Sequence, residues 1–263
     1  MELRGSSVLV TGATGGIGHA IVRHLHRAGA DLLITGRRAE VLEPLAAETG
    51  ARSLAVDLRD RDAVARLAEE AAGVDALVNN AAVPASGAIL DFSIEQIDKA
   101  VEVNLRAPMV LSRLLAERMV SRGRGHIVLV SSLAGKSSQP SSSVYSATKF
   151  GLRGFGQGLR ADLAPRGVGV SVIFPGFIRE AGMFHEADME LPRGVGTSTP
   201  DEVAAAVVRA IEHNRGEVDV APIPMRAGAV FASVAPGLAA KVAKRLGNDR
   251  VAEQLAEGQA HMR

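Results

Sequence analysis

A tyrosine, a lysine and a serine occur in one short stretch of this sequence and could together transfer a proton. Tyr145 and Lys149 are four residues apart, so on a helix their side chains lie on one face, a single turn apart. An ammonium group beside a phenol favours the phenolate, so we expect Lys149 to lower the pKa of Tyr145 from its usual value of about 10. Ser132 would hydrogen-bond to the oxygen that the phenol protonates. An exposed tyrosine and lysine on a solvated helix is the plainer interpretation, but Tyr145 is the only tyrosine in the chain. We therefore favour an acid–base site.

A glycine-rich turn near the amino terminus indicates where a nucleotide would bind. Residues 7–10 are a short β-branched run, residues 12–18 read GATGGIG, and residues 19–28 form an amphipathic helical segment. In this order, strand, turn and helix let a pyrophosphate approach the main chain and meet the N–H groups at the start of the helix. An ordinary tight connection between a strand and a helix is the alternative.

The end of the second expected strand bears on the choice of cofactor. An NAD site usually has an acidic residue there to bind the ribose, but this sequence has Gly36, Arg37 and Arg38. Arginine suits the 2′-phosphate of NADP, whereas a solvated charge pair at the start of a helix is the plainer alternative. Asp57, at the end of the third strand, lies on the edge where such sheets bind ligands.

Alternating apolar strands and amphipathic helices predict an α/β fold with a single doubly wound parallel sheet, Rossmann-like and flanked by helices on both faces. We assign residues 1–220 to a dinucleotide-binding catalytic domain and residues 221–263 to a helical extension of the same domain. The expected strands are 7–10, 32–35, 53–56, 76–78, 127–130, 170–174 and 217–220.

The helical run 93–119 contains Pro108, which cannot donate a hydrogen bond to the carbonyl group of Asn104. We expect a kink that frees this carbonyl group to hold a water molecule; a bent surface helix without such a role is the alternative.

Composition excludes several classes of protein. The net charge is +1 and aromatic residues make up 3%, which argues against binding to nucleic acid. The chain has no cysteine, so disulfides and thiolate metal sites are excluded, and its seven histidines form no metal-binding pattern. We find no signal peptide and no run of about 18 apolar residues, so we expect a soluble, cytoplasmic protein.

The helix that follows Tyr145 carries small residues on one side, at Ala147, Gly151, Gly154 and Gly158. Glycine in a helix costs up to about 1 kcal/mol relative to alanine, so we expect another helix to pack there, within the subunit or across a dimer. We predict a homo-oligomer, either a homodimer or a homotetramer, built from helices 93–119 and 145–164. The loop 177–199 is expected to be a mobile cover over the substrate.

The segment 221–248 contains no acidic residue and four basic ones. Apolar residues recur at three- or four-residue spacing, so we expect two short amphipathic helices hinged at Pro236. They could make peripheral contact with an anionic membrane, but a lid over the site or a subunit interface is the interpretation that we favour.

Taken together, the motifs resemble those of the short-chain dehydrogenase/reductase family in its classical form. The matching stretches, in family order and spacing across about residues 5–220, are TGATGGIG from Thr11, NNAA from Asn79, VNL from Val103, VSSLAG around Ser132, YSATK from Tyr145 and PG at Pro175. The resemblance implies strand order 3-2-1-4-5-6-7 and a catalytic tetrad of Asn104, Ser132, Tyr145 and Lys149. It also implies cofactor contacts from Gly12, Thr14, Gly16, Ile17, Gly18, Arg37, Asp57, Leu58, Asn80, Ala81, Tyr145, Lys149, Pro175, Gly176 and Ile178.

The family resemblance implies an NAD(P)-dependent oxidoreductase, and Arg37 favours NADP over NAD. The expected reaction is hydride transfer between the nicotinamide and a small-molecule carbonyl or secondary alcohol, with a lipophilic substrate. The alternative is a catalytically silent protein that binds a dinucleotide or senses redox state. The sequence departs from the family at Glu180, which replaces a threonine that helps to hold the cofactor.

Overall fold

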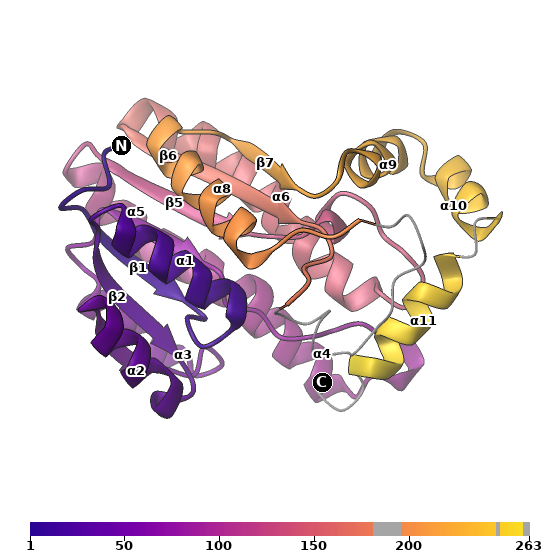
Figure 1. The fold of residues 1–263 in the computed structure, drawn as a ribbon, viewed down its shortest axis with the longest axis horizontal. Coiled ribbons are helices and arrows are strands. Elements are labelled where there is room, and N and C mark those ends of the chain that lie inside the picture. The colour runs from indigo at the N-terminus through magenta and orange to yellow at the C-terminus, as the bar shows by residue number, and fades with distance from the viewer. Residues whose placement is uncertain (181–195, 246–247, 260–263) are drawn as a thin grey trace.

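The computed structural model describes residues 1–180, 196–245 and 248–259, and its centre is a parallel sheet (Figure 1). Seven strands pair in the order β3-β2-β1-β4-β5-β6-β7, which confirms the predicted fold class and strand order. They are β1 (Ser7–Thr11), β2 (Asp31–Gly36), β3 (Arg52–Ala55), β4 (Ala76–Asn79), β5 (Gly125–Val130), β6 (Val168–Pro175) and β7 (Glu217–Val220). Every residue of β4, β5 and β6 is buried, as expected for strands covered on both faces.

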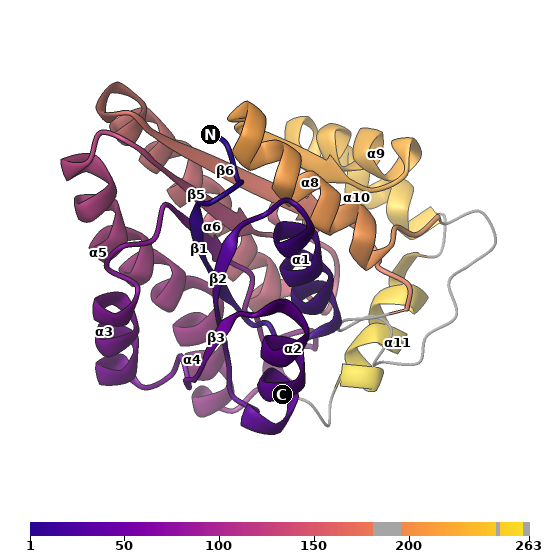
Figure 2. The same ribbon diagram turned by 60° about the vertical axis from the view of Figure 1, so that its left-hand side comes forward.

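Two helical layers cover the sheet, each over its own apolar core (Figure 2). The first layer contains α1 (Gly16–Arg27), α2 (Ala39–Thr49) and α8 (Pro200–His213). The second contains α3 (Arg61–Glu70), α5 (Ala107–Ser121) and α6 (Ser143–Leu163). Because the strands are parallel, all their carboxyl ends lie at one edge, where the connecting loops bring the predicted site residues together.

The predicted helix 93–119 is interrupted close to its proline. It consists of α4 (Ile94–Val101), a π-helical turn (Glu102–Arg106) and α5, with Pro108 in the first turn of α5. The N–H group of Ala107 donates to the carbonyl oxygen of Glu102, five residues back. The proline thus marks the irregularity that was expected, and its form is a widened turn centred on Asn104.

Within the described residues, three helices follow β7. They are α9 (Ile223–Val234), α10 (Pro236–Arg245) and α11 (Asn248–Gln259), and Figure 1 shows them at the end of the molecule away from α2 and α3. The prediction of two short helices meeting at Pro236 is confirmed, whereas α11 was not predicted. Within the described part of the chain, no helix is both long and apolar enough to cross a membrane.

Candidate active site

The end of β5 carries the first of the predicted catalytic groups. Ser132 follows this strand and caps the short 3-10 helix Leu133–Gly135, its hydroxyl oxygen accepting a hydrogen bond of 3.1 Å from the N–H group of Ala134. The neighbouring Ser131 hydroxyl donates to the main-chain carbonyl of Lys149 at 2.9 Å. The strand end and helix α6 are therefore tied together beside Ser132.

Tyr145 and Lys149 lie one turn apart on α6, as the spacing predicts. The Lys149 side chain is buried, and its ammonium group donates to the carbonyl oxygen of Val130 at 3.1 Å. The same nitrogen lies 5.6 Å from the centroid of the Tyr145 ring. The ring packs against a small apolar cluster that includes Val83, Ala85 and Val144. The two groups thus meet in a largely apolar environment.

The pKa values of this pair differ from the sequence-based expectation. Burial raises the pKa of Tyr145 to about 12, and a hydrogen bond with the Ser132 side chain opposes that rise. Burial lowers the pKa of Lys149 to about 8. The prediction of a lowered pKa for the phenol is wrong for this structure, because desolvation of the phenol outweighs its hydrogen bond with Ser132.

Asn104 is fully buried in the π-helical turn. Its side chain oxygen accepts from the N–H group of Val83 at 2.7 Å, and its side chain nitrogen donates to the Val83 carbonyl at 3.0 Å. The amide therefore fastens the widened turn to the loop after β4, and the predicted role of Asn104 rests on its main-chain carbonyl.

The glycine turn between β1 and α1 brings the main chain close to the loop after β4. Gly12 has a positive φ of 68°, and a Cβ atom added there would lie 2.6 Å from Cα of Ala81. A Cβ atom at Gly18 would overlap the carbonyl oxygen of Gly12. Helix α1 begins at Gly16, next to Ile17, and no side chain caps it. This tight turn with uncapped N–H groups fits the pyrophosphate of a nicotinamide dinucleotide.

Asn80 joins the carboxyl ends of β1 and β4. Its side chain donates to the carbonyl oxygens of Thr11 and Gly12, both at 3.1 Å. In return, the Thr11 hydroxyl accepts from the N–H groups of Asn80 and Ala81 at 3.1 and 3.2 Å. Thr11 was not among the predicted site residues, although its position at the start of the glycine motif could have indicated this role.

The structure separates the two arginines that follow β2. Arg38 donates to the carbonyl oxygen of Thr14 at 2.8 Å and so braces the glycine turn. Arg37 is exposed. Position 36 must be glycine, because a Cβ atom there would lie 2.6 Å from a Thr14 methyl group. Arg38 is exposed as well, but its guanidinium group is engaged by the Thr14 carbonyl, so Arg37 is the better candidate to meet a ligand.

Asp57 is held by Arg59, which was not among the predicted site residues. Both of its carboxylate oxygens bind the guanidinium group of Arg59, with distances from 2.5 to 3.1 Å. These hydrogen bonds are the main reason that the pKa of Asp57 lies below its usual value. The side chain of Leu58 is buried in the core beneath β1 and β2. Any contact between Asp57 and an adenine must therefore form while the Asp57 carboxylate is bound to Arg59.

The loop after β6 brings three more predicted residues to the same edge. Pro175 ends the strand, Gly176 donates to the carbonyl of Val220 at 2.9 Å, and Ile178 forms an isolated parallel bridge with Ser198. Glu180 has a positive φ of 71°, and its carboxylate accepts from Arg179 at 3.1 Å. Most of the predicted substrate cover, residues 181–195, lies outside the described residues.

Sequence reasoning missed Lys136. Its ammonium group is buried and contacts Asp219 at 2.6 Å and Glu217 at 3.1 Å, both on β7. The same group lies 4.0 Å above the Phe174 ring, and the Lys136 carbonyl accepts from Ser233 of α9 at 2.6 Å. Lys136 thus joins the Ser132 loop to β7 and to the carboxyl-terminal extension.

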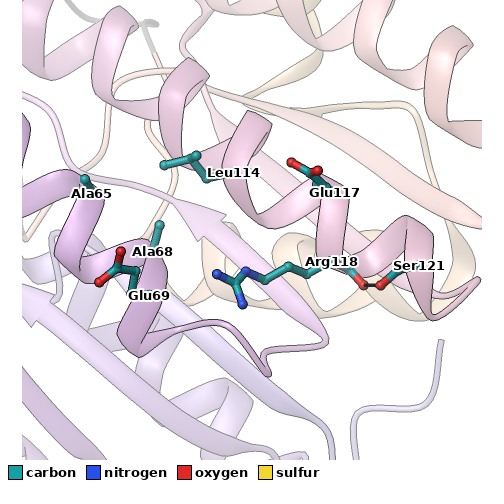
Figure 3. A pocket seen from close by; sticks show the side chains of 7 residues that line it. All are labelled: Ala65, Ala68, Glu69, Leu114, Glu117, Arg118 and Ser121. Carbon is teal, nitrogen blue, oxygen red and sulfur yellow. Dashed lines mark hydrogen bonds between the residues drawn. The ribbon is translucent and has the colours of Figure 1, made fainter.

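A groove of about 430 Å³ lies apart from these residues (Figure 3). Helices α3 and α5 form its walls, and in Figure 3 Arg118 points from α5 toward the side of Glu69, while Ser121 donates back to the Arg118 carbonyl. None of the predicted catalytic or cofactor residues lines this groove, whose lining residues are Ala65, Ala68, Glu69, Leu114, Glu117, Arg118 and Ser121. We place the chemistry at the carboxyl edge of the sheet instead.

Comparison with known proteins identifies the family of this chain. Residues 6–191 match the family model described as short chain dehydrogenase. Ketoacyl reductase HetN of Nostoc sp. is 36% identical over 233 residues, which cover 85% of this chain and 81% of HetN.

Solved structures give the same result. A short-chain dehydrogenase from Sphingobium yanoikuyae in complex with NADPH superimposes with a TM-score of 0.77 at 27% identity, covering 88% of this chain and 94% of that one. A metagenomic short-chain oxidoreductase in complex with NADP gives a TM-score of 0.71 at 33% identity, covering 84% and 99%.

Proposed function

The chain belongs to the short-chain dehydrogenase/reductase family, and from that premise we propose that it reduces the carbonyl group of a lipophilic small molecule with NADPH. Membership makes it an NAD(P)-dependent oxidoreductase. The direction, the preference for NADP and the class of substrate are the parts that we propose.

The meeting of Tyr145 with the buried ammonium of Lys149 at the end of β5 is the observation that carries this proposal. A phenol with a pKa of about 12 is protonated at neutral pH, which is the form that a general acid needs when a carbonyl is reduced. Lys149, with a pKa of about 8, remains mostly charged at neutral pH and stays fixed by the Val130 carbonyl. The pair is thus in the protonation state that suits reduction.

We assign a role to each of the four residues of the predicted tetrad. When bound, the nicotinamide supplies the hydride. Tyr145 donates a proton to the substrate oxygen, and Ser132 hydrogen-bonds to the same oxygen and orients it. Lys149 binds the nicotinamide ribose and passes protons to the phenol. Asn104, in its widened turn, holds with its main-chain carbonyl the water from which those protons come.

NADP is the proposed cofactor because of Arg37. No carboxylate is offered at Gly36, and an exposed guanidinium group is suited to a 2′-phosphate. The glycine turn would hold the pyrophosphate. The NADP and NADPH found in two of the similar structures support this preference.

Two features support a lipophilic carbonyl substrate. The Tyr145 ring lies among apolar residues, which favour an apolar molecule beside the reacting group. One relative is named a ketoacyl reductase, and an acyl chain bearing a ketone would be such a molecule.

We also propose a homo-oligomer that packs through α5 and α6. Gly154 and Gly158 are exposed, and an added Cβ atom at either would meet nothing within 4 Å, so none of the helices that the structure describes in the same subunit packs on them. Phe150 and Met109 are exposed by 42% and 38% on these helices. A partner subunit that packs here would bury the two glycines and the two apolar side chains.

Replacing Tyr145 with phenylalanine tests the function. We expect the variant to keep NADPH binding, because only the phenol oxygen is removed and the ring remains, but to lose about 10²- to 10⁴-fold in turnover of a ketone that the wild type reduces. Wild-type turnover by Y145F would refute the mechanism. If a panel of aldehydes, ketones and secondary alcohols gave no turnover with the wild type either, the silent dinucleotide-binding alternative would replace it.

A further inference from the structure

Helices α9 and α10 present apolar side chains to the outside of the molecule. Val234 is 81% exposed, Ile223 is 77% exposed and Leu238 is 55% exposed. The set, which we call the α9–α10 face, comprises Ile223, Val230, Phe231, Val234, Leu238 and Val242, together with the basic residues Arg226 and Lys241. Large apolar side chains that cluster on a surface mark an interaction site more often than scattered ones do.

The opposite side of α9 is already occupied, so this face cannot be satisfied by turning the helix inward. Ala229 is buried, and Met225 packs against the same core. Ser233 donates to the Lys136 carbonyl at 2.6 Å, which fixes the helix beside the loop that carries Ser132. The orientation of α9 is therefore set by its inner contacts.

The charges of this segment all have one sign. Residues 221–248 contain no aspartate or glutamate, and their basic residues are Arg226, Lys241, Lys244 and Arg245. Arg226 lies 3.8 Å from Asp219, but that carboxylate already binds Lys136 at 2.6 Å. The apolar side chains of the α9–α10 face are thus accompanied by basic residues, and residues 221–248 contain no acidic residue to neutralise them.

This charge pattern selects the partner. A second copy of the chain, related by two-fold symmetry, would place this face against the same face of its partner. Arg226 and Lys241 of one subunit would then lie near basic residues of the other, which repel them. An anionic lipid surface complements both features, because it attracts the basic residues and takes up the apolar ones. We propose that the α9–α10 face binds peripherally to the surface of an anionic membrane. The inner contacts of α9 would then hold the Ser132 loop beside the lipid, from which a lipophilic substrate could reach Tyr145.

Vesicle flotation of the full-length protein tests this proposal. We expect the wild type to float with phosphatidylcholine vesicles that contain phosphatidylglycerol at low salt, to float less at high salt, and to stay in solution with phosphatidylcholine alone. Lys241→Glu should weaken binding about fivefold or more, since each basic residue at such a surface contributes roughly that factor. Val234→Ser should weaken it by about tenfold through the lost apolar contact.

Matched variants elsewhere on the surface provide the controls. Leu90→Ser removes an apolar side chain that is 94% exposed, and Arg166→Glu reverses an exposed charge, both outside the face. Neither should change flotation, and all four variants should keep NADPH binding. Absence of wild-type flotation with the anionic vesicles would overturn the proposal, as would equal losses in the control variants. If Val234→Ser instead lowered the sedimentation mass and left flotation unchanged, the face would be a subunit interface and the proposal would be wrong.

Discussion

The ammonium group of Lys136 lies 2.6 Å from a carboxylate oxygen of Asp219, and this contact joins the Ser132 loop to β7. Glu217 shares the same ammonium at 3.1 Å, and it also accepts from Arg153 of α6 at 3.0 Å. A single buried lysine thus connects the strand at the edge of the sheet with the helix that carries Tyr145. We therefore expect Lys136 to act as a positioning residue for the site.

Lys136→Met should therefore lower both stability and turnover. Removing Lys136 takes the nearest cation away from Asp219, whose remaining ion-pair partner, Arg226, is 3.8 Å away, and we expect this to cost about 3 kcal/mol in the free energy of unfolding. Thermal unfolding and kcat, measured at a temperature where the variant is folded, check this. Lys241→Met, which removes an exposed lysine, is the control. Unchanged kcat in folded K136M would show that the network is structural only.

The rate of reduction should depend on the ionisation of Lys149. Because burial lowers its pKa to about 8, the ammonium is charged below that pH and loses its proton as the pH rises through it. Tyr145, with a pKa of about 12, stays protonated over the same range. We expect kcat for ketone reduction to be level near pH 7 and to fall above about pH 8. A profile that kept rising through pH 9 would contradict this assignment.

The elements of the fold could be predicted from the sequence better than the electrostatics of the site. Buried strands are short, largely apolar runs, and Pro108 signals a break in its helix, because both effects are local. The partners of Lys136 lie some eighty residues away on β7, so nothing beside the lysine identifies them. The spacing of Tyr145 and Lys149 predicts their proximity but contains no information about burial, which reverses the expected shift in the phenol's pKa. Likewise, the sequence alone does not distinguish Arg37 from Arg38, and only the structure shows that Arg38 binds the glycine turn.

The proposed oligomer predicts an effect of a charged residue at Gly154. Nothing lies within 4 Å of an added Cβ atom there, so Gly154→Glu should fit the isolated subunit and should favour its helix. Across a close subunit contact the same side chain would bury an unpaired charge. We expect sedimentation to give a lower mass for G154E than for the wild type. Gly73→Glu, at an exposed glycine with equal space outside the helix, should keep the wild-type mass. A monomeric wild type at micromolar concentration would remove the basis for the prediction.

Cofactor preference should depend on Arg37 and not on Arg38. In Arg37→Asp, a carboxylate replaces the guanidinium group, repels a 2′-phosphate and can accept from a ribose hydroxyl, so kcat/KM should fall about tenfold or more with NADPH and rise with NADH. Arg38→Ala is the matched control, because this arginine holds the Thr14 carbonyl at 2.8 Å and its loss should loosen the glycine turn for both cofactors alike. Initial rates with each cofactor, for one ketone and for all three proteins, give the comparison. Equal efficiency of the wild type with NADPH and NADH would defeat the argument, and so would a loss of selectivity in R38A that matched the loss in R37D.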